Sequence, residues 1–410
     1  MDINSPSYTV KRFSNVLVVP FTDLLAWRET PCKYRGGPIW PNWHVQKSIR
    51  FNGGFYEPTD AKPIFEAPKK RITGEHHFYI GPLYEHFGHQ IRDFSSRIMP
   101  SITVDPQAVL VFASHKRNPW QDLSQVPDFF NQILKWFGRT ESNVLIVSEP
   151  TIFDHLCVIP EPEPPLENPD ARIAKTIYIS DLTKHAATRN VIQDDRMAAY
   201  VSRTQFFSQI LGEYEIERWF AALGYTIFHP QDHSLETQLD LYLSCRTVVF
   251  AEGSALHALQ LLGRNLKRIF VLLRRRGDTT FTPMLKARSL EPEIIDVIRG
   301  TIRFNSHVDR DVAVLDFERL KKALIRVDPK ICKHTNRVLF YRSQRRQLIH
   351  TLLSTRPRTL RSTIALVRSL ALVRPRGYLV TLGLSLLLLP VDQLWRIINQ
   401  KRKLSSVTFR

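Results

Sequence analysis

One short turn of the sequence, AEGSALHALQLLG, gathers an acid, a small flexible residue, a hydroxyl and an imidazole: Glu252, Gly253, Ser254 and His257. The turn follows the apolar run TVVF, which predicts a buried strand. Gly253 would permit a ligand to approach the backbone, and Ser254 would cap a helix whose free N–H groups bind an anion. The turn therefore predicts a phosphate site. A capping serine beside a half-buried histidine is the alternative.

Arg203 ends a second expected strand, AAYVSR at residues 198–203. A guanidinium offers paired donors to phosphate oxygens, whereas a lone arginine at such a place more often forms a surface salt bridge. The carboxyl ends of parallel strands meet at one edge of a sheet, so we expect Arg203 to join the phosphate site.

A third cluster lies in the sequence YEHFGHQIRDFSSRIMP, residues 84–100. A helix from Gly88 onward would place His89 and Asp93 on one face, with His86 at its start. Such a pair suits a base and its orienting partner, or two groups that bind an acceptor hydroxyl. Solvated helix residues are the alternative, and a metal site is disfavoured because no third ligand follows at a characteristic distance.

The elements that must position these residues alternate strands and helices. After residue 197 the pattern is βαβαβαβ, with strands at 198–203, 225–230, 247–253 and 267–273 and helices between them. Continuous apolar strands joined by amphipathic helices predict a doubly wound parallel sheet. Four apolar runs before residue 160 predict further strands, at residues 76–83, 108–114, 143–149 and 155–160.

Composition and linkers predict two domains followed by a tail. The stretch IPEPEPPLENPD, residues 159–170, is typical of an interdomain linker. We therefore expect domains at 1–165 and 166–335 and a basic tail at 336–410. Residues 333–410 hold sixteen Lys and Arg and one acid, a net charge of +15, which leaves +3 of the total +18 for the rest of the chain. The four cysteines have no metal-ligand spacing and are expected to be free thiols.

The tail interleaves arginine with two apolar stretches, residues 362–373 and 377–391. The second has fifteen uncharged residues, fewer than the roughly 20 that cross a bilayer. We expect it to lie on an anionic membrane surface, with helices packed on the first domain as the alternative. Nucleic-acid binding is disfavoured because the tail lacks a recognised motif and an aromatic stacking set. The N-terminus has no signal-peptide pattern, so the expected location is cytoplasmic, peripheral on the inner membrane face.

Five of these elements, taken in order, resemble glycosyltransferase family 61, whose bacterial members are often labelled capsular polysaccharide biosynthesis proteins. They are FGHQIRD, the SR strand end at 202–203, the GE helix start at 212–213, a glutamine before the penultimate strand, and the EGSAL turn at 252–256. The resemblance covers roughly residues 75–275. It implies a GT-B-like α/β architecture, in which two Rossmann-like domains face each other across a cleft.

The resemblance also implies roles for individual residues. His89 and Asp93 fall on the family's histidine and acidic positions, and Asp93 is the expected catalytic base with His89 as its rival. The donor-binding positions carried over are Arg203, Glu213, Gln238, Gly253 and Ser254. Three positions depart from the family pattern: His86 replaces Asn, Gln90 replaces Trp, and Glu252 replaces a histidine that here stands at His257.

The implied activity is inverting transfer of a hexosyl or pentosyl group from a nucleotide sugar to a polysaccharide or lipid-linked glycan, without a metal or other cofactor. The acceptor hydroxyl would lose its proton as it attacks, while cationic groups stabilise the departing diphosphate. Because Glu252 departs from the pattern, the alternative is an inactive glycan- or nucleotide-sugar-binding assembly component.

Overall fold

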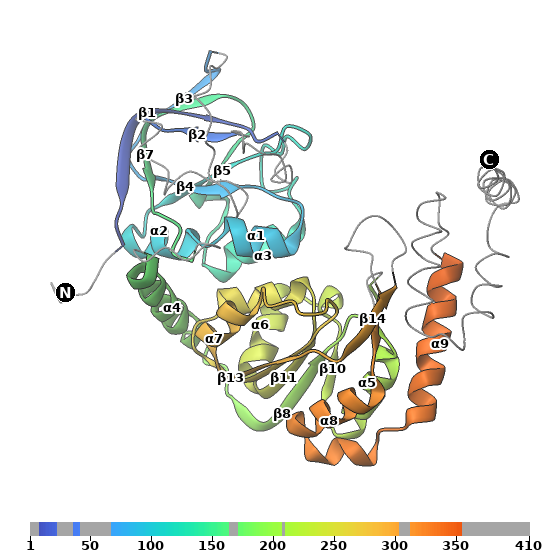
Figure 1. The fold of residues 1–410 in the computed structure, drawn as a ribbon. Coiled ribbons are helices and arrows are strands. Elements are labelled where there is room, and N and C mark those ends of the chain that lie inside the picture. Colours follow the sequence, from blue (N-terminus) through green and yellow to red (C-terminus); the bar gives the residue numbers. More distant parts are fainter. Residues whose placement is uncertain are drawn as a thin grey trace, which may run out of the picture.

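The computed structural model describes residues 8–22, 36–41, 67–163, 171–206, 210–302 and 312–354. These residues form two lobes, each built on its own main sheet (Figure 1). The first lobe comprises β1–β7 and α1–α3, and the second lobe comprises β8–β15 and α5–α8. The helix α4 (Ala171–Ala187) connects them, and α9 (Arg337–Ser354) follows the second lobe.

The first-lobe sheet has the order β2-β1-β7-β4-β5-β6, with β3 paired to β7. Its strands are β1 (Lys11–Val19), β2 (Gly37–Ile39), β3 (Lys70–Ile72), β4 (His77–Pro82), β5 (Val109–Ala113), β6 (Val144–Val147) and β7 (Thr151–Val158). The four predicted strands correspond to β4–β7, and β4, β5 and β6 pair in parallel. The sequence did not predict β1, which pairs antiparallel with β2 and β7, so the sheet is mixed.

The described α-helices of the first lobe are α1 (Phe87–Phe94), α2 (Ile98–Val104) and α3 (Asp128–Trp136). In Figure 1, α1 and α3 lie on the side of this lobe that faces the second lobe. Direct contacts join α1 to the 3-10 helix η5 (Ser254–Leu261) and α3 to α6 (Leu235–Ser244). The two lobes therefore meet through these helices.

The main second-lobe sheet has the order β10-β8-β11-β12-β13, and every pairing in it is parallel. Its strands are β8 (Asp194–Val201), β10 (Thr226–Phe228), β11 (Cys245–Ala251), β12 (Leu266–Leu272) and β13 (Ser289–Ile295). The predicted parallel sheet is confirmed. The fifth strand, β13, was not predicted, because its sequence SLEPEII mixes acids and a proline with few apolar residues.

The remaining elements of the second lobe complete its core and edge. They are β9 (Ile210–Leu211), α5 (Glu213–Ala222), η4 (Pro230–Asp232), α7 (Thr282–Arg288), β14 (Ile298–Ile302), β15 (Val312–Leu315), α8 (Phe317–Val327) and η7 (Pro329–Lys333). The strands β14, β15 and β9 form a separate small sheet. The predicted helix at 254–263 is the 3-10 helix η5, and Ser254 makes no side-chain cap there, so that part of the prediction is wrong.

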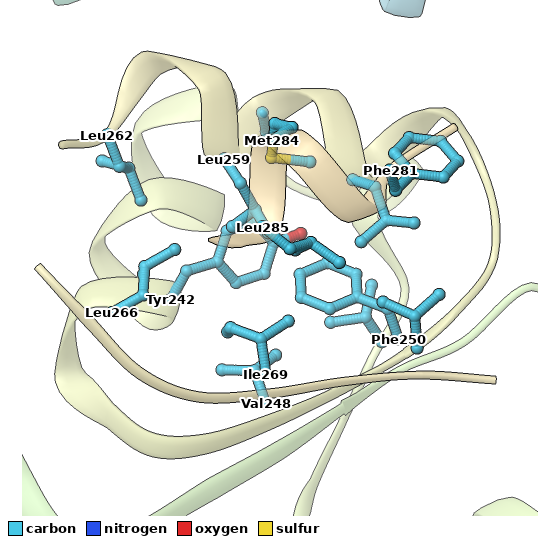
Figure 2. Packing of buried hydrophobic residues seen from close by; sticks show 14 of the residues in the cluster. Tyr242, Val248, Phe250, Leu259, Leu262, Leu266, Ile269, Phe281, Met284 and Leu285 are labelled. Carbon is cyan, nitrogen blue, oxygen red and sulfur yellow. The ribbon is translucent and has the colours of Figure 1, made fainter. Parts of the chain in front are cut away.

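Apolar packing holds these helices to the sheet. Figure 2 shows Val248 and Phe250 of β11 and Ile269 of β12 meeting Leu259 of η5 and Leu285 of α7. All five side chains are at most 1% exposed. Because β11 is buried along almost its whole length, it is fixed as a central strand, and its carboxyl end at Ala251 is held rigidly beneath the interlobe contact.

The first part of the predicted tail belongs to the fold. Phe340 of α9 packs against Trp219 of α5 in a tilted arrangement, with ring centroids 5.5 Å apart, and Gln344 Nε2 donates to the carbonyls of Leu211 and Leu315. α9 therefore packs on the second lobe. Residues 355–410, with both predicted apolar stretches, lie outside the described residues. Within the described residues, no helix is long and apolar enough to span a bilayer.

Candidate functional site

A single helical turn of α1 joins His89 to Asp93. His89 Nδ1 lies 2.8 Å from Asp93 Oδ2, as the spacing of four residues predicted. Arg92 Nε lies 3.5 Å from the other carboxylate oxygen. The two partners differ in access, because the Asp93 side chain is 4% exposed and the His89 side chain 37%. The sequence favoured Asp93 as the base, but this burial suits Asp93 to orienting His89.

The start of α1 is shaped by its own side chains. His86 is the N-cap residue, and its Nδ1 accepts a hydrogen bond of 3.4 Å from the His89 backbone N–H. Gln90 is fully buried, and its Oε1 accepts a 2.7 Å hydrogen bond from the Tyr84 backbone N–H. Gln90 therefore fixes the turn before α1.

The first turn of α1 packs directly on η5. A Cβ atom added to Gly88 would lie 2.8 Å from His257 Cδ2 and 3.2 Å from Ser254 Cβ, so only glycine allows this approach. His257 Nδ1 bonds Gln260 Oε1 at 2.9 Å. Burial lowers the pKa of His257 to about 4. A neutral imidazole thus lies in the contact between the lobes.

Arg203 lies against the backbone of Gly253, as the sequence predicted for two strand ends of one sheet. A Cβ atom added to Gly253 would lie 1.9 Å from Arg203 Nη1. Burial first, and the neighbouring guanidinium of Arg274 second, lower the pKa of Arg203 to about 10. Arg274 is itself 7% exposed. Two positive groups therefore stand close together at the ends of β8 and β12, where an anion would be stabilised.

Glu213 is a buried scaffold for the end of β8. Its Oε1 accepts hydrogen bonds from the Arg203 backbone N–H at 2.7 Å and from the Tyr200 hydroxyl at 3.2 Å. The side chain has no exposed surface, and this burial raises its pKa to about 7. Glu213 was expected to bind the donor, but the structure places it behind Arg203, where it fixes the backbone of that arginine.

Glu252 is likewise fully buried. Its Oε2 accepts from the backbone N–H groups of Arg274 and Arg275 at 2.8 and 2.9 Å, and its Oε1 accepts from Arg275 Nε at 2.6 Å. Both carboxylate oxygens are thus occupied by the segment after β12. Glu252, which departs from the family pattern, therefore fixes the backbone of the segment that carries Arg274 and Arg275.

A cavity of about 340 Å³ lies between the lobes, at the carboxyl ends of β8, β10 and β11. The predicted residues Arg203, Gln238 and Ser254 line it. Gln238 Nε2 donates to the Pro230 carbonyl at 2.9 Å, while its buried Oε1 has no hydrogen-bond partner among the described residues. The first lobe closes the cavity with aromatic side chains. Its volume is that of a small-molecule site.

The sequence did not single out several groups at this site. Phe87 and Phe129 come from the first lobe and pack edge to face, with ring centroids 5.7 Å apart; both line the cavity. Arg274 was not singled out either, although the run RRRG begins two residues after the end of β12 and could have signalled it. Glu161 lies near the start of the predicted linker; burial raises its pKa to about 7, and the Asp93 charge acts in the same direction. Only the folded chain brings these residues together.

The predicted site residues thus fall into three groups. His86, His89, Asp93 and His257 lie around the α1–η5 contact; Arg203, Gln238, Gly253 and Ser254 lie at or beside the cavity; Glu213 and Glu252 support the arginine-bearing segments from behind. Among the described residues, no three His, Cys, Asp or Glu side chains are grouped to hold a metal ion.

An α/β fold with parallel strands and a cavity at their carboxyl ends is compatible with a Rossmann-like glycosyltransferase. Residues 87–267 match the model of the glycosyltransferase 61 family. This match agrees with the resemblance seen in the sequence and supports glycosyltransferase activity in general for the matched segment. No curated protein matches the chain.

Proposed function

We propose that the protein is an inverting glycosyltransferase with a GT-B-like arrangement, transferring a hexosyl or pentosyl group from a nucleotide sugar to a polysaccharide or lipid-linked glycan. The observation that carries the proposal is the interlobe cavity, which has Arg203 on its second-lobe wall and the first turn of α1 on the other side. A donor diphosphate at Arg203 would direct its sugar toward α1.

In this proposal His89 is the catalytic base and Asp93 its positioning residue. With Nδ1 bonded to Asp93, His89 has Nε2 available to accept the proton of an acceptor hydroxyl. The hydroxyl oxygen attacks the anomeric carbon as the bond from that carbon to the diphosphate oxygen breaks. Arg203 and Arg274 stabilise the negative charge on the leaving diphosphate, and the reaction inverts the anomeric centre.

The test is a panel of uridine, guanosine, cytidine and thymidine sugar nucleotides, incubated with the full chain and with glycan acceptors. Nucleotide release together with a new glycoside of inverted configuration supports the proposal. Arg203→Ala is the critical variant. Arg196→Ala is its matched control, because the Arg196 side chain is 91% exposed and lies at the opposite end of β8.

The second candidate function is an inactive binding component of a surface polysaccharide pathway. Glu252, which stands where the family has histidine, is the observation that favours it. Binding of a sugar nucleotide without turnover on any acceptor would favour this second function. Absence of nucleotide-sugar binding would contradict the transferase, and binding of a glycan without nucleotide-sugar binding would favour the glycan-binding form of the second function.

We further propose that the tail holds the protein on an anionic membrane surface, at the cytoplasmic face of the inner membrane. The support is the net charge of +15 over residues 333–410. Each arginine near anionic lipid contributes about 1 kcal/mol. Replacing Arg356, Arg358 and Arg361 by glutamine should weaken cosedimentation with phosphatidylserine vesicles, and salt should weaken that of the native chain. Salt-independent binding, or none, would contradict this proposal.

A further inference from the structure

A second and larger cavity, of about 800 Å³, lies between α5, residues 204–206 and α9. Figure 1 shows α9 beside α5 at the edge of the second lobe. The cavity adjoins the interlobe cavity, because Phe206 lines both. None of the predicted site residues lines it, so the proposed transfer reaction leaves it without a role.

Arginines line this cavity from two sides. Arg342 and Arg346 are four residues apart on α9 and so share one face of the helix, while Arg218 comes from α5. Among the described residues, no carboxylate lies within ion-pair distance of Arg342 or Arg346. Arg218 pairs with Glu215 at 3.5 Å and is 76% exposed. Two cations of α9 therefore face the cavity without a carboxylate partner in the described part of the chain.

The two acids that line the cavity, Glu215 and Glu217, both have partners other than the arginines of α9. Glu215 is 8% exposed and forms the pair with Arg218. Glu217 accepts a 2.8 Å hydrogen bond from the Thr204 hydroxyl and lies 3.7 Å from His229 Nε2. Neither acid is paired to the arginines of α9, so the α9 side of the cavity keeps its positive charge.

A buried amide adds an independent signal. Gln347 lines the cavity and is 5% exposed. Its Oε1 accepts a hydrogen bond from the backbone N–H of Gly212. This bond fixes the amide orientation. The other amide atom, Nε2, is buried and has no acceptor among the described residues. A buried donor without an acceptor is costly unless a ligand supplies one.

We propose that the cavity between α5 and α9 binds a phosphate-bearing ligand, held by Arg342 and Arg346 and by Gln347 Nε2. A guanidinium binds phosphate oxygens through paired N–H donors, and a phosphate oxygen supplies the acceptor that Gln347 needs. The volume exceeds what one phosphate requires and suits a diphosphate or a phosphorylated headgroup. The ligand is either a lipid headgroup or a soluble phosphate compound.

The experiment compares two double variants of the full chain. Arg342→Gln with Arg346→Gln removes two charges from the cavity. Arg337→Gln with Arg345→Gln removes two charges from the same helix outside the lining. Each is titrated calorimetrically with inorganic pyrophosphate and, separately, cosedimented with phosphatidylcholine vesicles containing phosphatidic acid. Every titration is repeated in an Arg203→Gln background, which removes the arginine proposed to bind the donor diphosphate.

The cavity variant should bind at least one of the two probes about tenfold more weakly than the control variant, with or without Arg203. If the cavity variant binds only pyrophosphate more weakly, the ligand is a soluble phosphate compound. If it binds only the vesicles more weakly, the ligand is a lipid headgroup. Weaker binding of both probes identifies a headgroup whose phosphate enters the cavity. Equal binding by the two double variants with both probes overturns the proposal. The result does not depend on sugar transfer, because neither probe is a glycosyl donor and the comparison holds without Arg203.

Discussion

The polar groups on the two sides of the interlobe contact are assembled in different ways. On the first lobe, His89 and Asp93 belong to one helix and meet through a spacing of four residues. On the second lobe, Arg203, Gly253 and Arg274 come from three separate strand ends. The first group is a local pair suited to moving a proton, and the second is a distributed group suited to binding an anion. The contrast predicts that first-lobe changes affect turnover and second-lobe changes affect donor affinity.

The largest expected effect is on turnover, from His89→Gln. Loss of a general base lowers kcat by about 10²- to 10⁴-fold, while nucleotide affinity stays unchanged because no second-lobe group is altered. Asp93→Asn should cost less, since it disturbs the orientation of His89 without removing the base. Initial rates at saturating donor measure both. A larger loss from Asp93→Asn than from His89→Gln would restore Asp93 as the base.

The next largest expected effect is a loss of donor affinity in Arg203→Ala. Removing a charge-assisted contact to the diphosphate should weaken binding of the nucleotide by about 10- to 100-fold. Calorimetric titration measures the change, and Arg203→Lys, which keeps the charge but loses the paired donors, should recover part of it. Unchanged affinity in Arg203→Ala would show that the diphosphate binds elsewhere.

A smaller effect, on stability, is expected from His257→Gln at acid pH. The unfolded chain binds a proton near pH 6.5, but the folded pKa is lowered to about 4, so the free energy of unfolding falls as pH decreases from 6.5 to 4. At pH 5 this loss is about 2 kcal/mol. Denaturant unfolding at pH 7.5 and at pH 5 measures the change. Between these two pH values the free energy of unfolding should fall less in His257→Gln than in the native chain. His155→Gln, at an exposed position on β7, should decline like the native chain.

The smallest effect concerns the contact between Arg203 and Gly253. In Gly253→Ala the new methyl group would displace the guanidinium, because a Cβ atom there lies 1.9 Å from Nη1. The arginine is flexible and can adjust, so nucleotide affinity should fall by less than in Arg203→Ala, with turnover at saturation retained. A fall in kcat without a change in affinity would contradict the separation of roles between the lobes.

The sequence by itself determined features that depend on short spacings. The alternation of apolar runs and amphipathic segments located β8, β10, β11 and β12 and their parallel pairing, because each crossover returns the chain to the same sheet. The i, i+4 spacing located the pair of His89 and Asp93, because helix geometry alone brings such residues together.

Only the tertiary structure decided what depends on distant partners. Glu252 resembled a ligand-binding acid in the sequence, but its bonding partners stand 22 and 23 residues later, in a segment that only strand pairing brings near. Burial of Glu213 and the contact of Gly88 with His257 arise in the same way. The cavities join residues of both lobes, or of α5 and α9, because side-chain packing between remote segments sets burial and access, which local periodicity does not encode.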